Sequence, residues 1–277
     1  MTQKSILITG CSSGIGYDAA HTLHKRGWRV FATCRAETDC ERLRGEGLES
    51  FQLDYEDETT IKAAVAETLT RTGGTLDALF NNGAYAIPGL VQDLPRDALR
   101  AIFEANLFGY FDLINQVMPA MLKQGHGRII NCSSVLGFGA MRARGSYNAT
   151  KFALEGLTDT MRLELRTQPI DICLIEPGPI TTEFRNNAKG QYERWIDWKN
   201  SPRKSFYEKV LMPRLYEPSK GLDFGELPSS AVTKKLIHAL ESNRPKPRYY
   251  VPTPTYIVGA LKRLLTTRAL DRILGRL

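Results

Sequence analysis

Short apolar runs alternate with longer amphipathic stretches along most of the chain. A mostly apolar run without regular polar interruption is typical of a parallel strand that is buried on both faces. Such runs predict strands at 4–9, 28–33, 49–53, 76–80, 128–132 and 170–176, with helical patterns between them and a last short strand near 248–251. Strands that alternate with helices predict an α/β fold. We therefore expect a single-domain Rossmann fold over residues 1–277, in which a doubly wound parallel sheet of about seven strands carries helices on both faces.

A glycine-rich turn joins the first predicted strand to the first predicted helix. The helix runs to about Arg26, with Gly27 as its cap. Glycines let a backbone approach a phosphate closely, and the first turn of a helix offers free N–H groups and a positive dipole. The turn therefore predicts a pyrophosphate-binding site in a dinucleotide fold. Its residues are Gly10, Cys11, Ser12, Ser13, Gly14, Ile15 and Gly16.

The end of the second predicted strand bears on which dinucleotide binds. A dinucleotide fold usually places Asp or Glu there to hold the ribose 2′-hydroxyl, but this chain has Cys34 followed by Arg35. A missing acid beside a guanidinium fits a 2′-phosphate, to which Ser12 adds a hydrogen bond, so NADP(H) is favoured over NAD(H). Nearby acids at 37 and 39 argue against this preference. Asp54, at the end of strand 49–53, is predicted to accept a hydrogen bond from the adenine amino group.

The stretch 127–155 carries the predicted chemistry. Strand 128–132 ends in two serines, a glycine-rich loop follows, and a helix that opens near Ser146 carries Tyr147 and Lys151. Residues four apart lie on one helix face, so the ammonium is expected to favour the ionised phenol. A free tyrosine, with a pKa of about 10, exchanges its proton poorly near neutral pH. Since ligands collect at the carboxyl ends of parallel strands, a strand-end serine is expected at the same place.

Three other segments are candidates for the same site. The turn Asn81-Asn82-Gly83-Ala84 follows strand 76–80, and its small residues are predicted to let a cofactor pass close to the backbone. Asn106 is a polar residue in an apolar part of a long helical region at 95–123, where it needs hydrogen-bond partners from the structure or from a site. The segment Pro177 to Thr182 follows strand 170–176 directly.

Residues 184–228 interrupt the strand–helix alternation. They combine aromatic residues with many charges and prolines directly after a strand that is predicted to end at the cofactor. We expect this segment to be a substrate lid, and its aromatic content predicts an apolar or amphipathic substrate. The alternative is that the aromatic side chains only cover the sheet or an oligomer contact.

Composition narrows the function classes. With 42% hydrophobic and 24% charged residues, the chain is ordinary for a globular protein, and no run of 18 apolar residues predicts a membrane span. The start goes directly into a strand without a signal-peptide pattern. The five cysteines are expected to be reduced thiols of a cytoplasmic protein, and no metal site is expected because His21 and His24 lack a third ligand nearby.

The net charge of +7 is carried entirely by the C-terminal part of the chain. From Arg244 onward there are eight basic residues and one acid, so the preceding residues balance to zero. A nucleic-acid-binding protein would spread its positive charge over a folded face, so nucleic acid is not expected as a partner. Residues 254–277 have the pattern of a basic amphipathic helix. This tail is predicted either to dock on protein or to lie on an anionic membrane at its inner face.

The order of these motifs resembles the short-chain dehydrogenase/reductase family over nearly the full chain. Residues 9–16, TGCSSGIG, match the family's T-G-x-x-x-G-I-G motif, and Ser134 precedes Tyr147 by the usual 13 residues. This motif, the Cys34-Arg35 strand end and the helix ALEGLTDTMRLEL are most similar to the branch of 17β-hydroxysteroid and retinol dehydrogenases and its bacterial aldehyde-reducing members. One departure stands at 81–84, where the family's N-N-A-G is N-N-G-A.

The resemblance implies roles for individual residues. Asn106, in Asn-Leu-Phe-Gly, matches the family's catalytic asparagine, which holds a water that refills the proton path. Lys151 holds the nicotinamide ribose as well as lowering the pKa of Tyr147. A homodimer or homotetramer built on long helices is also implied. The residues that match the segment lining the nicotinamide side are Pro177, Gly178, Ile180 and Thr182.

The expected reaction is the NADPH-dependent reduction of an apolar aldehyde or ketone, reversible as alcohol oxidation. Tyr147 gives the proton to the carbonyl oxygen, and Ser134 positions that oxygen. Two other functions remain open. A reductase of carrier-bound 3-oxoacyl groups uses the same residues, and a non-enzymatic NADP-binding regulator would use the basic tail for a partner.

Overall fold

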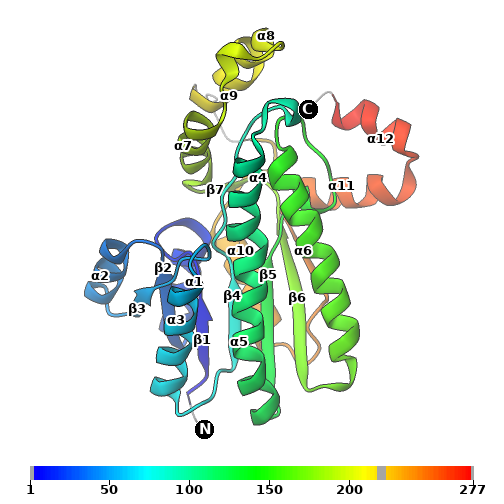
Figure 1. Cartoon of the computed structure of the whole chain (residues 1–277). Coiled ribbons are helices and arrows are strands. Elements are labelled where there is room, and N and C mark those ends of the chain that lie inside the picture. Colours follow the sequence, from blue (N-terminus) through cyan, green and yellow to red (C-terminus); the bar gives the residue numbers. More distant parts are fainter. Residues whose placement is uncertain (1–2, 217–222, 276–277) are drawn as a thin grey trace.

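A seven-stranded parallel sheet with the order β3-β2-β1-β4-β5-β6-β9 forms the centre of the computed structural model, which describes residues 3–216 and 223–275 (Figure 1). The expected Rossmann fold with about seven strands is confirmed. The strands are β1 (Ser5–Ile8), β2 (Arg29–Cys34), β3 (Glu49–Gln52), β4 (Ala78–Asn81), β5 (Gly127–Cys132), β6 (Ile170–Pro177) and β9 (Arg248–Val251).

Helices cover both faces of this sheet, as the doubly wound arrangement requires. One apolar cluster joins the sheet to α1 (Gly14–Lys25), α2 (Glu37–Gly45) and α10 (Ser230–Glu241). A second cluster joins the opposite face to α3 (Glu58–Thr72), α5 (Gly109–Gln124) and α6 (Gly145–Glu164). The chain reverses its winding direction between β1 and β4, and ligands bind at such switch points, outside the carboxyl ends of the strands.

The long helical region predicted at 95–123 is divided by one wide turn. It consists of α4 (Arg96–Phe103), a π-helical turn (Glu104–Phe108) and α5. Turns of this kind are rare and often occur at functional sites. The turn contains Asn106, so the irregular part of the helix coincides with the candidate site residue.

Residues 184–216 and 223–228 of the predicted lid form helices and one short strand at one end of the sheet, and residues 217–222 lie outside the described part (Figure 1). The π-helical residue Tyr207 is fully buried, and its hydroxyl donates to the Asp93 carboxylate at 2.6 Å and accepts from the Leu90 N–H at 3.0 Å. These bonds fix the segment to the loop before α4. Its elements are α7 (Phe184–Trp195), a 3₁₀ turn (Trp198–Asn200), α8 (Lys204–Phe206), a π-helical turn (Tyr207–Leu211), α9 (Met212–Tyr216) and β8 (Leu227–Pro228), which pairs with β7 (Ile180–Thr181).

The basic tail is two helices rather than one. α11 (Thr253–Leu264) and α12 (Thr267–Leu274) are separated at Leu265, whose backbone is extended, so the predicted single amphipathic helix is wrong. α11 lies against β9 and the 3₁₀ turn Val135–Gly137, whereas α12 has no buried residue.

No helix in the described ranges is long and apolar enough to cross a membrane. Two further 3₁₀ turns are Val91–Asp93 and Leu165–Thr167.

Candidate active site

The glycine turn after β1 leaves the first turn of α1 open to a ligand. Ser13 is the N-cap of α1, but its side chain makes no capping hydrogen bond, and the first turn contains no acid. The free N–H groups and the positive end of the helix dipole therefore point to an anion from outside the chain. Gly14 adopts a φ of 58°, which favours glycine, and a Cβ there would approach Thr182 to 3.0 Å.

The other two glycines of the motif allow close contacts between backbone segments. A Cβ on Gly10 would lie 2.6 Å from the Cα of Gly83, and a Cβ on Gly16 would lie 2.3 Å from the Gly10 carbonyl oxygen. The exchange of glycine and alanine at 83–84 is accommodated, because Ala84 does not adopt a positive φ. The turns after β1 and β4 are thus packed together beneath the candidate cofactor site.

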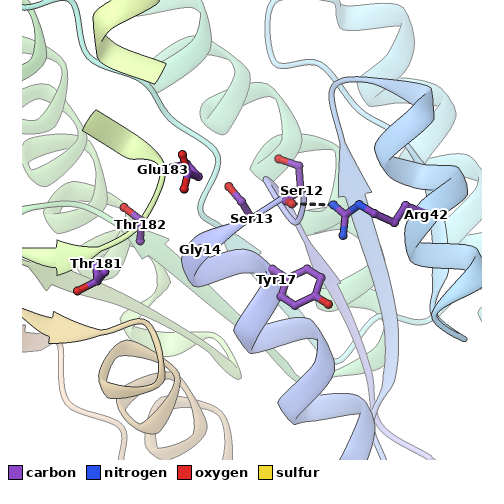
Figure 2. A pocket seen from close by; sticks show the side chains of 8 residues that line it. All are labelled: Ser12, Ser13, Gly14, Tyr17, Arg42, Thr181, Thr182 and Glu183. Carbon is purple, nitrogen blue, oxygen red and sulfur yellow. Dashed lines mark hydrogen bonds between the residues drawn. The ribbon is translucent and has the colours of Figure 1, made fainter. Parts of the chain in front are cut away.

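A cavity of about 430 Å³ lies above this turn (Figure 2). Thr182 and Glu183 face Ser13 and Gly14 across it, and Arg42 reaches in from α2 to donate to the Ser12 carbonyl at 2.7 Å. The lining residues are Ser12, Ser13, Gly14, Tyr17, Arg42, Thr181, Thr182 and Glu183. Ser12, Ser13, Gly14 and Thr182 were predicted from the sequence and lie together here.

Arg42 is the basic residue at this cavity that the sequence analysis missed, and Tyr17, Thr181 and Glu183 were also not among the predicted site residues. It pairs with Asp39 at 3.2 Å and Glu46 at 3.1 Å, and its guanidinium lies 5.5 Å from the centre of the Tyr17 ring. It follows Arg35 by seven residues, about two helical turns, so only the placement of α2 brings it to the turn. A basic residue two turns into the helix after β2 is the signal that could have indicated it.

Arg35 and Asp54, which were predicted to contact the adenosine, do not line the cavity with the residues of the glycine turn. Arg35 is exposed directly after β2, and its side chain makes no ion pair within the described ranges. Asp54 is partly buried two residues after β3, and its carboxylate caps the N–H of Glu56 at 3.1 Å. Ile15 is partly buried in the first turn of α1, where it packs on the core. The proposed contacts of Arg35 and Asp54 with the cofactor remain predictions.

The side chain of Asn81, the first residue of the turn predicted to lie close to the cofactor, is hydrogen-bonded within the protein. It is fully buried, accepts from the Tyr55 hydroxyl at 2.8 Å and donates to Asn131 at 3.0 Å. The Tyr55 hydroxyl also bonds Thr9 at 2.7 Å. This polar network links β1, β4 and β5 below the turns, so the Asn81 side chain shapes the strand ends, and a contact of its backbone with the cofactor remains a prediction.

The strand-end serine and the two helix residues converge as predicted. Ser134, Tyr147 and Lys151 are all buried, and Ser134 is hydrogen-bonded to Tyr147. The Lys151 ammonium donates to the Cys132 carbonyl at 2.8 Å and lies 5.7 Å from the centre of the Tyr147 ring. The ring of Phe184, from α7, contacts the Tyr147 ring at 5.4 Å between centroids. These contacts place a phenol, a hydroxyl and an ammonium at the carboxyl end of β5.

The electrostatics of this group are dominated by burial. Burial raises the pKa of the Tyr147 phenol above its usual range, although the hydrogen bond with Ser134 acts in the opposite direction. Burial also lowers the pKa of Lys151 to about 8. In the chain alone the cost of ionising a buried phenol outweighs the favourable interactions, and the lowering of the Tyr147 pKa by Lys151 remains a prediction.

Asn106 is fully buried, and its side chain is already satisfied by protein. Its amide oxygen accepts from the Tyr85 N–H at 3.1 Å, and its NH₂ donates to the Tyr85 carbonyl at 2.8 Å and to Thr150 at 3.3 Å. Thr150 is on α6 between Tyr147 and Lys151. Asn106 thus joins the π-helical turn to the helix that carries the proton donor, and the water that the resemblance implies remains a prediction.

The segment after β6 completes the group. Ser134 donates to the Pro177 carbonyl at 3.4 Å, and a Cβ on Gly178 would lie 2.7 Å from the Thr255 hydroxyl. Ile180 is partly buried in β7. The backbone between Pro177 and Thr182 therefore runs from the serine to the rim of the cavity above the glycine turn. No group of three or more side chains able to hold a metal ion occurs within the described ranges.

The chain belongs to the family of short-chain dehydrogenases, whose model matches residues 4–193. Members of this family are oxidoreductases that use a nicotinamide cofactor. The chain is 37% identical over 273 residues to the uncharacterized oxidoreductase YbbO of Escherichia coli (strain K12), covering 98% of this chain and 94% of YbbO. It is 31% identical to human retinol dehydrogenase 8, over 99% of this chain and 91% of that protein. The predicted family and its retinol dehydrogenase-like relatives are thereby confirmed.

A solved structure supports the same conclusion. A short-chain dehydrogenase from Streptomyces avermitilis superposes with a TM-score of 0.80 at 25% identity, covering 100% of this chain and 97% of the other. This match extends beyond the residues that the family model covers.

Proposed function

We propose that the chain is an NADP(H)-dependent oxidoreductase that interconverts an apolar aldehyde or ketone with the corresponding alcohol. The observation that carries the proposal is the convergence of Ser134, Tyr147 and Lys151 beside the glycine turn, at the carboxyl end of β5. These groups donate hydrogen bonds and exchange a proton, and they offer no strong nucleophile and no metal ligands.

The site fits a nicotinamide dinucleotide. The uncapped first turn of α1 and the cavity of about 430 Å³ suit a pyrophosphate between Ser13 and Thr182. We assign further contacts to the backbone of Gly10, Gly14, Ile15, Gly16 and Gly83, and to the segment from Pro177 through Gly178 and Ile180. The bound nicotinamide supplies or accepts a hydride at the carbonyl carbon.

The residues of the chain handle the proton. Tyr147 gives its proton to the carbonyl oxygen as an alcohol forms, and takes it back in the reverse direction. Ser134 donates a hydrogen bond to the same oxygen and holds it near the phenol. Lys151 holds the nicotinamide ribose and stabilises the phenolate that remains, and Asn106 holds the water that restores the proton.

The preference for NADP(H) is assigned to the basic residues beside the adenosine. Arg35 is exposed after β2, and Arg42 lies against Ser12 at the cavity. Two guanidinium groups and the Ser12 hydroxyl provide donors for a 2′-phosphate, and no acid is present at the end of β2 to hold a free 2′-hydroxyl.

We assign residues 184–228 as a substrate lid. The segment packs its buried aromatic side chains and Phe184 onto the loop before α4 and onto Tyr147 itself. A substrate at Tyr147 would therefore contact apolar side chains of α7, which favours an apolar body.

We further propose a cytoplasmic homodimer or homotetramer with a lipid-facing tail. Exposed apolar side chains gather on the π-helical turn, α5 and α6, at Phe108, Phe111, Leu122, Phe152 and Leu163. Phe111→Glu should reduce the mass measured by light scattering to that of a monomer, whereas Lys123→Glu should not.

The exposed α12 carries Arg268 and Arg272. Loss of binding to acidic vesicles on deletion of 266–277 would support the lipid contact, and unchanged sedimentation would end it.

The function is tested by following nicotinamide absorbance with NADPH and NADH over aliphatic aldehydes, retinal and steroid ketones. Faster turnover with NADPH on one class supports the proposal.

Tyr147→Phe should remove nearly all turnover while NADPH still binds, and an active variant would exclude Tyr147 as the proton donor. Binding of NADPH without turnover on any free carbonyl would favour a carrier-bound 3-oxoacyl substrate, and then a regulator.

A further inference from the structure

The N-terminal end of α6 carries an arginine that no acid in the described ranges neutralises. Arg144 is the N-cap residue of α6 and precedes Tyr147 by three positions. It is half-buried, its side chain donates one hydrogen bond, to the Ala143 carbonyl at 3.3 Å, and no ion pair within the described ranges involves it. A guanidinium has five N–H donors, and buried charges in proteins are normally paired. Most donors of Arg144 therefore lack an acceptor among the described residues.

The backbone holds this arginine in place at an energetic cost. Ala143 adopts a φ of 55°, the one positive value at a non-glycine residue within the described ranges. Its carbonyl accepts from the Gly89 N–H at 3.0 Å, and Ser146 donates to the Ile87 carbonyl at 3.1 Å. The loop before α4 thus clamps both sides of Arg144. A strained backbone persists only where surrounding contacts enforce it, and such positions cluster at functional sites.

Two more guanidinium groups add positive charge around Arg144. Arg185 lies on α7, next to the Phe184 that contacts the Tyr147 ring, and is paired with Asp223 at 2.7 Å. Arg214 lies on α9. Burial, followed by repulsion from Arg214 and Arg185, lowers the pKa of Arg144 to about 10. The predicted lid therefore brings two further arginines toward the half-buried Arg144, and its Asp223 carboxylate pairs with Arg185.

The cofactor phosphates do not account for this charge. The cavity above the glycine turn is lined by Ser12 through Gly14 and by Thr181 through Glu183, and Arg144 is not part of its wall. Arg144 instead belongs to the turn that leads into Tyr147, and its charge favours the ionised form of that phenol. The missing acceptor therefore lies on the side of Tyr147 where the carbonyl compound binds.

We propose that Arg144 binds a carboxylate of the substrate, so that the substrate class is oxo acids with an apolar body and the corresponding hydroxy acids. The planar fork of a guanidinium matches the two oxygens of a carboxylate. The carbonyl end lies at Tyr147, and the carboxylate lies one helical turn earlier at Arg144. This inference rests on the proposed function and specifies its substrate.

The test compares two matched substrate series with NADPH: (ω−1)-oxo acids of four to ten carbons and 2-alkanones of the same chain length. At the best chain length, the oxo acid should have a kcat/KM at least about tenfold above that of the ketone. Arg144→Gln should lower kcat/KM for that oxo acid about 100-fold, mainly through KM, and change the ketone less than about threefold. Arg144→Lys should restore part of the loss.

Arg142 provides a matched control, since it is an exposed arginine two residues away. Arg142→Gln should change neither series. A readout without turnover is the protection by an unreactive alkanoate against thermal unfolding, which Arg144→Gln should remove. Equal kcat/KM for acids and ketones, or equal losses on both series in Arg144→Gln, would overturn the carboxylate site and leave the proposed function intact. Failure of every carbonyl compound to oxidise bound NADPH would overturn the proposed function, and the alkanoate measurement would still decide on the site.

Discussion

Two arginines that contact α6 or its cap differ in how the chain neutralises them. Arg248, on β9, donates to Glu176 at 2.8 Å, to Asp159 at 2.6 Å and to Glu155. Glu176 is fully buried and Glu155 nearly so. Arg144, at the start of the same helix, has no carboxylate partner among the described residues. This part of the chain thus supplies three acids to one cation and none to the other.

The difference separates a structural charge from one that awaits a ligand. The group around Arg248 ties α6 to β6 and β9, and it includes Glu155, one turn after Lys151. One guanidinium joins two acids of α6 to one acid of β6, so its role is to hold the catalytic helix in position. The end of α6 at Arg144 lies instead at the predicted lid, where the cost of an unpaired cation is offset only when an anion binds.

The largest expected effect comes from removing the cation of the Arg248 group. Arg248→Ala leaves Glu155, Glu176 and Asp159 without their shared cation, and should lower the free energy of unfolding by about 3–5 kcal/mol. Urea unfolding monitored by tryptophan fluorescence measures this loss. Arg244→Ala, at an exposed arginine of the same region, should stay within about 0.5 kcal/mol. A loss below 1 kcal/mol in Arg248→Ala would show that the group does not hold α6.

Lys151 is a second cation of α6 without a carboxylate in contact, and its titration gives the next effect. Burial lowers its pKa to about 8, so the ammonium is fully present below pH 7 and is lost as pH rises through 8. Since Tyr147 has a raised pKa, the titration of Lys151 should determine the alkaline limb of the pH profile of kcat/KM. We expect kcat/KM for carbonyl reduction to fall about tenfold per pH unit above 8.

The Lys151 assignment is checked with a variant that keeps the charge. Lys151→Arg should be slower at every pH but should lack the limb near pH 8, because a guanidinium stays protonated throughout this range. The pH profile of kcat/KM from 6 to 10 measures both. A limb that persists unchanged in Lys151→Arg would assign the titration to another group.

Ionisation of Glu176 has a smaller effect, on the dependence of stability on pH. The direction of this effect follows from the burial of the Glu176 carboxyl. Burial, followed by repulsion from Glu155, raises the pKa of Glu176 to about 8, against the opposing charge of Arg248. Between its usual range and pH 8 the folded chain keeps a proton that the unfolded chain releases, so stability falls as pH rises through this window. Glu176→Gln, which cannot ionise, should show a smaller fall in urea midpoint between pH 5 and pH 8.5. Glu41→Gln, at an exposed helix position, should match the wild type, and equal falls in all three proteins would contradict the assignment.

The sequence predicts the cofactor side of the molecule better than the substrate side, for a physical reason. The glycine turn and the Tyr147–Lys151 spacing are local patterns, whose geometry follows from one turn or one helix. The interval of 13 residues before Tyr147, usual in the family, also indicated Ser134. Local patterns are sufficient to predict the cofactor side because residues close together in the sequence form it.

What the sequence did not reveal depends on contacts between distant residues. The hydrogen bonds of the Asn81 side chain could not be predicted, because its partners Tyr55 and Asn131 are distant in the sequence. Arg42 reaches the cavity only through the placement of α2. The isolation of Arg144 is harder still to predict, because it requires knowing that no acid in the described ranges approaches it. The pattern of residues 254–277 likewise suggested one helix and did not show the break at Leu265.

The smallest expected effect is on the free energy of unfolding of Arg144→Gln. Its sign is opposite to that expected for Arg248→Ala, so it completes the comparison of the two arginines. Arg144→Gln removes a half-buried cation that has only one hydrogen bond, at 3.3 Å, so little is lost and repulsion from Arg185 and Arg214 is relieved. The free energy of unfolding should stay unchanged or rise by up to about 1 kcal/mol. Urea unfolding without ligand measures this, with Arg142→Gln expected to show no change. A loss of 2 kcal/mol or more would give Arg144 a structural role like that of Arg248, and an unchanged stability together with the loss of oxo-acid selectivity would assign its charge to the substrate.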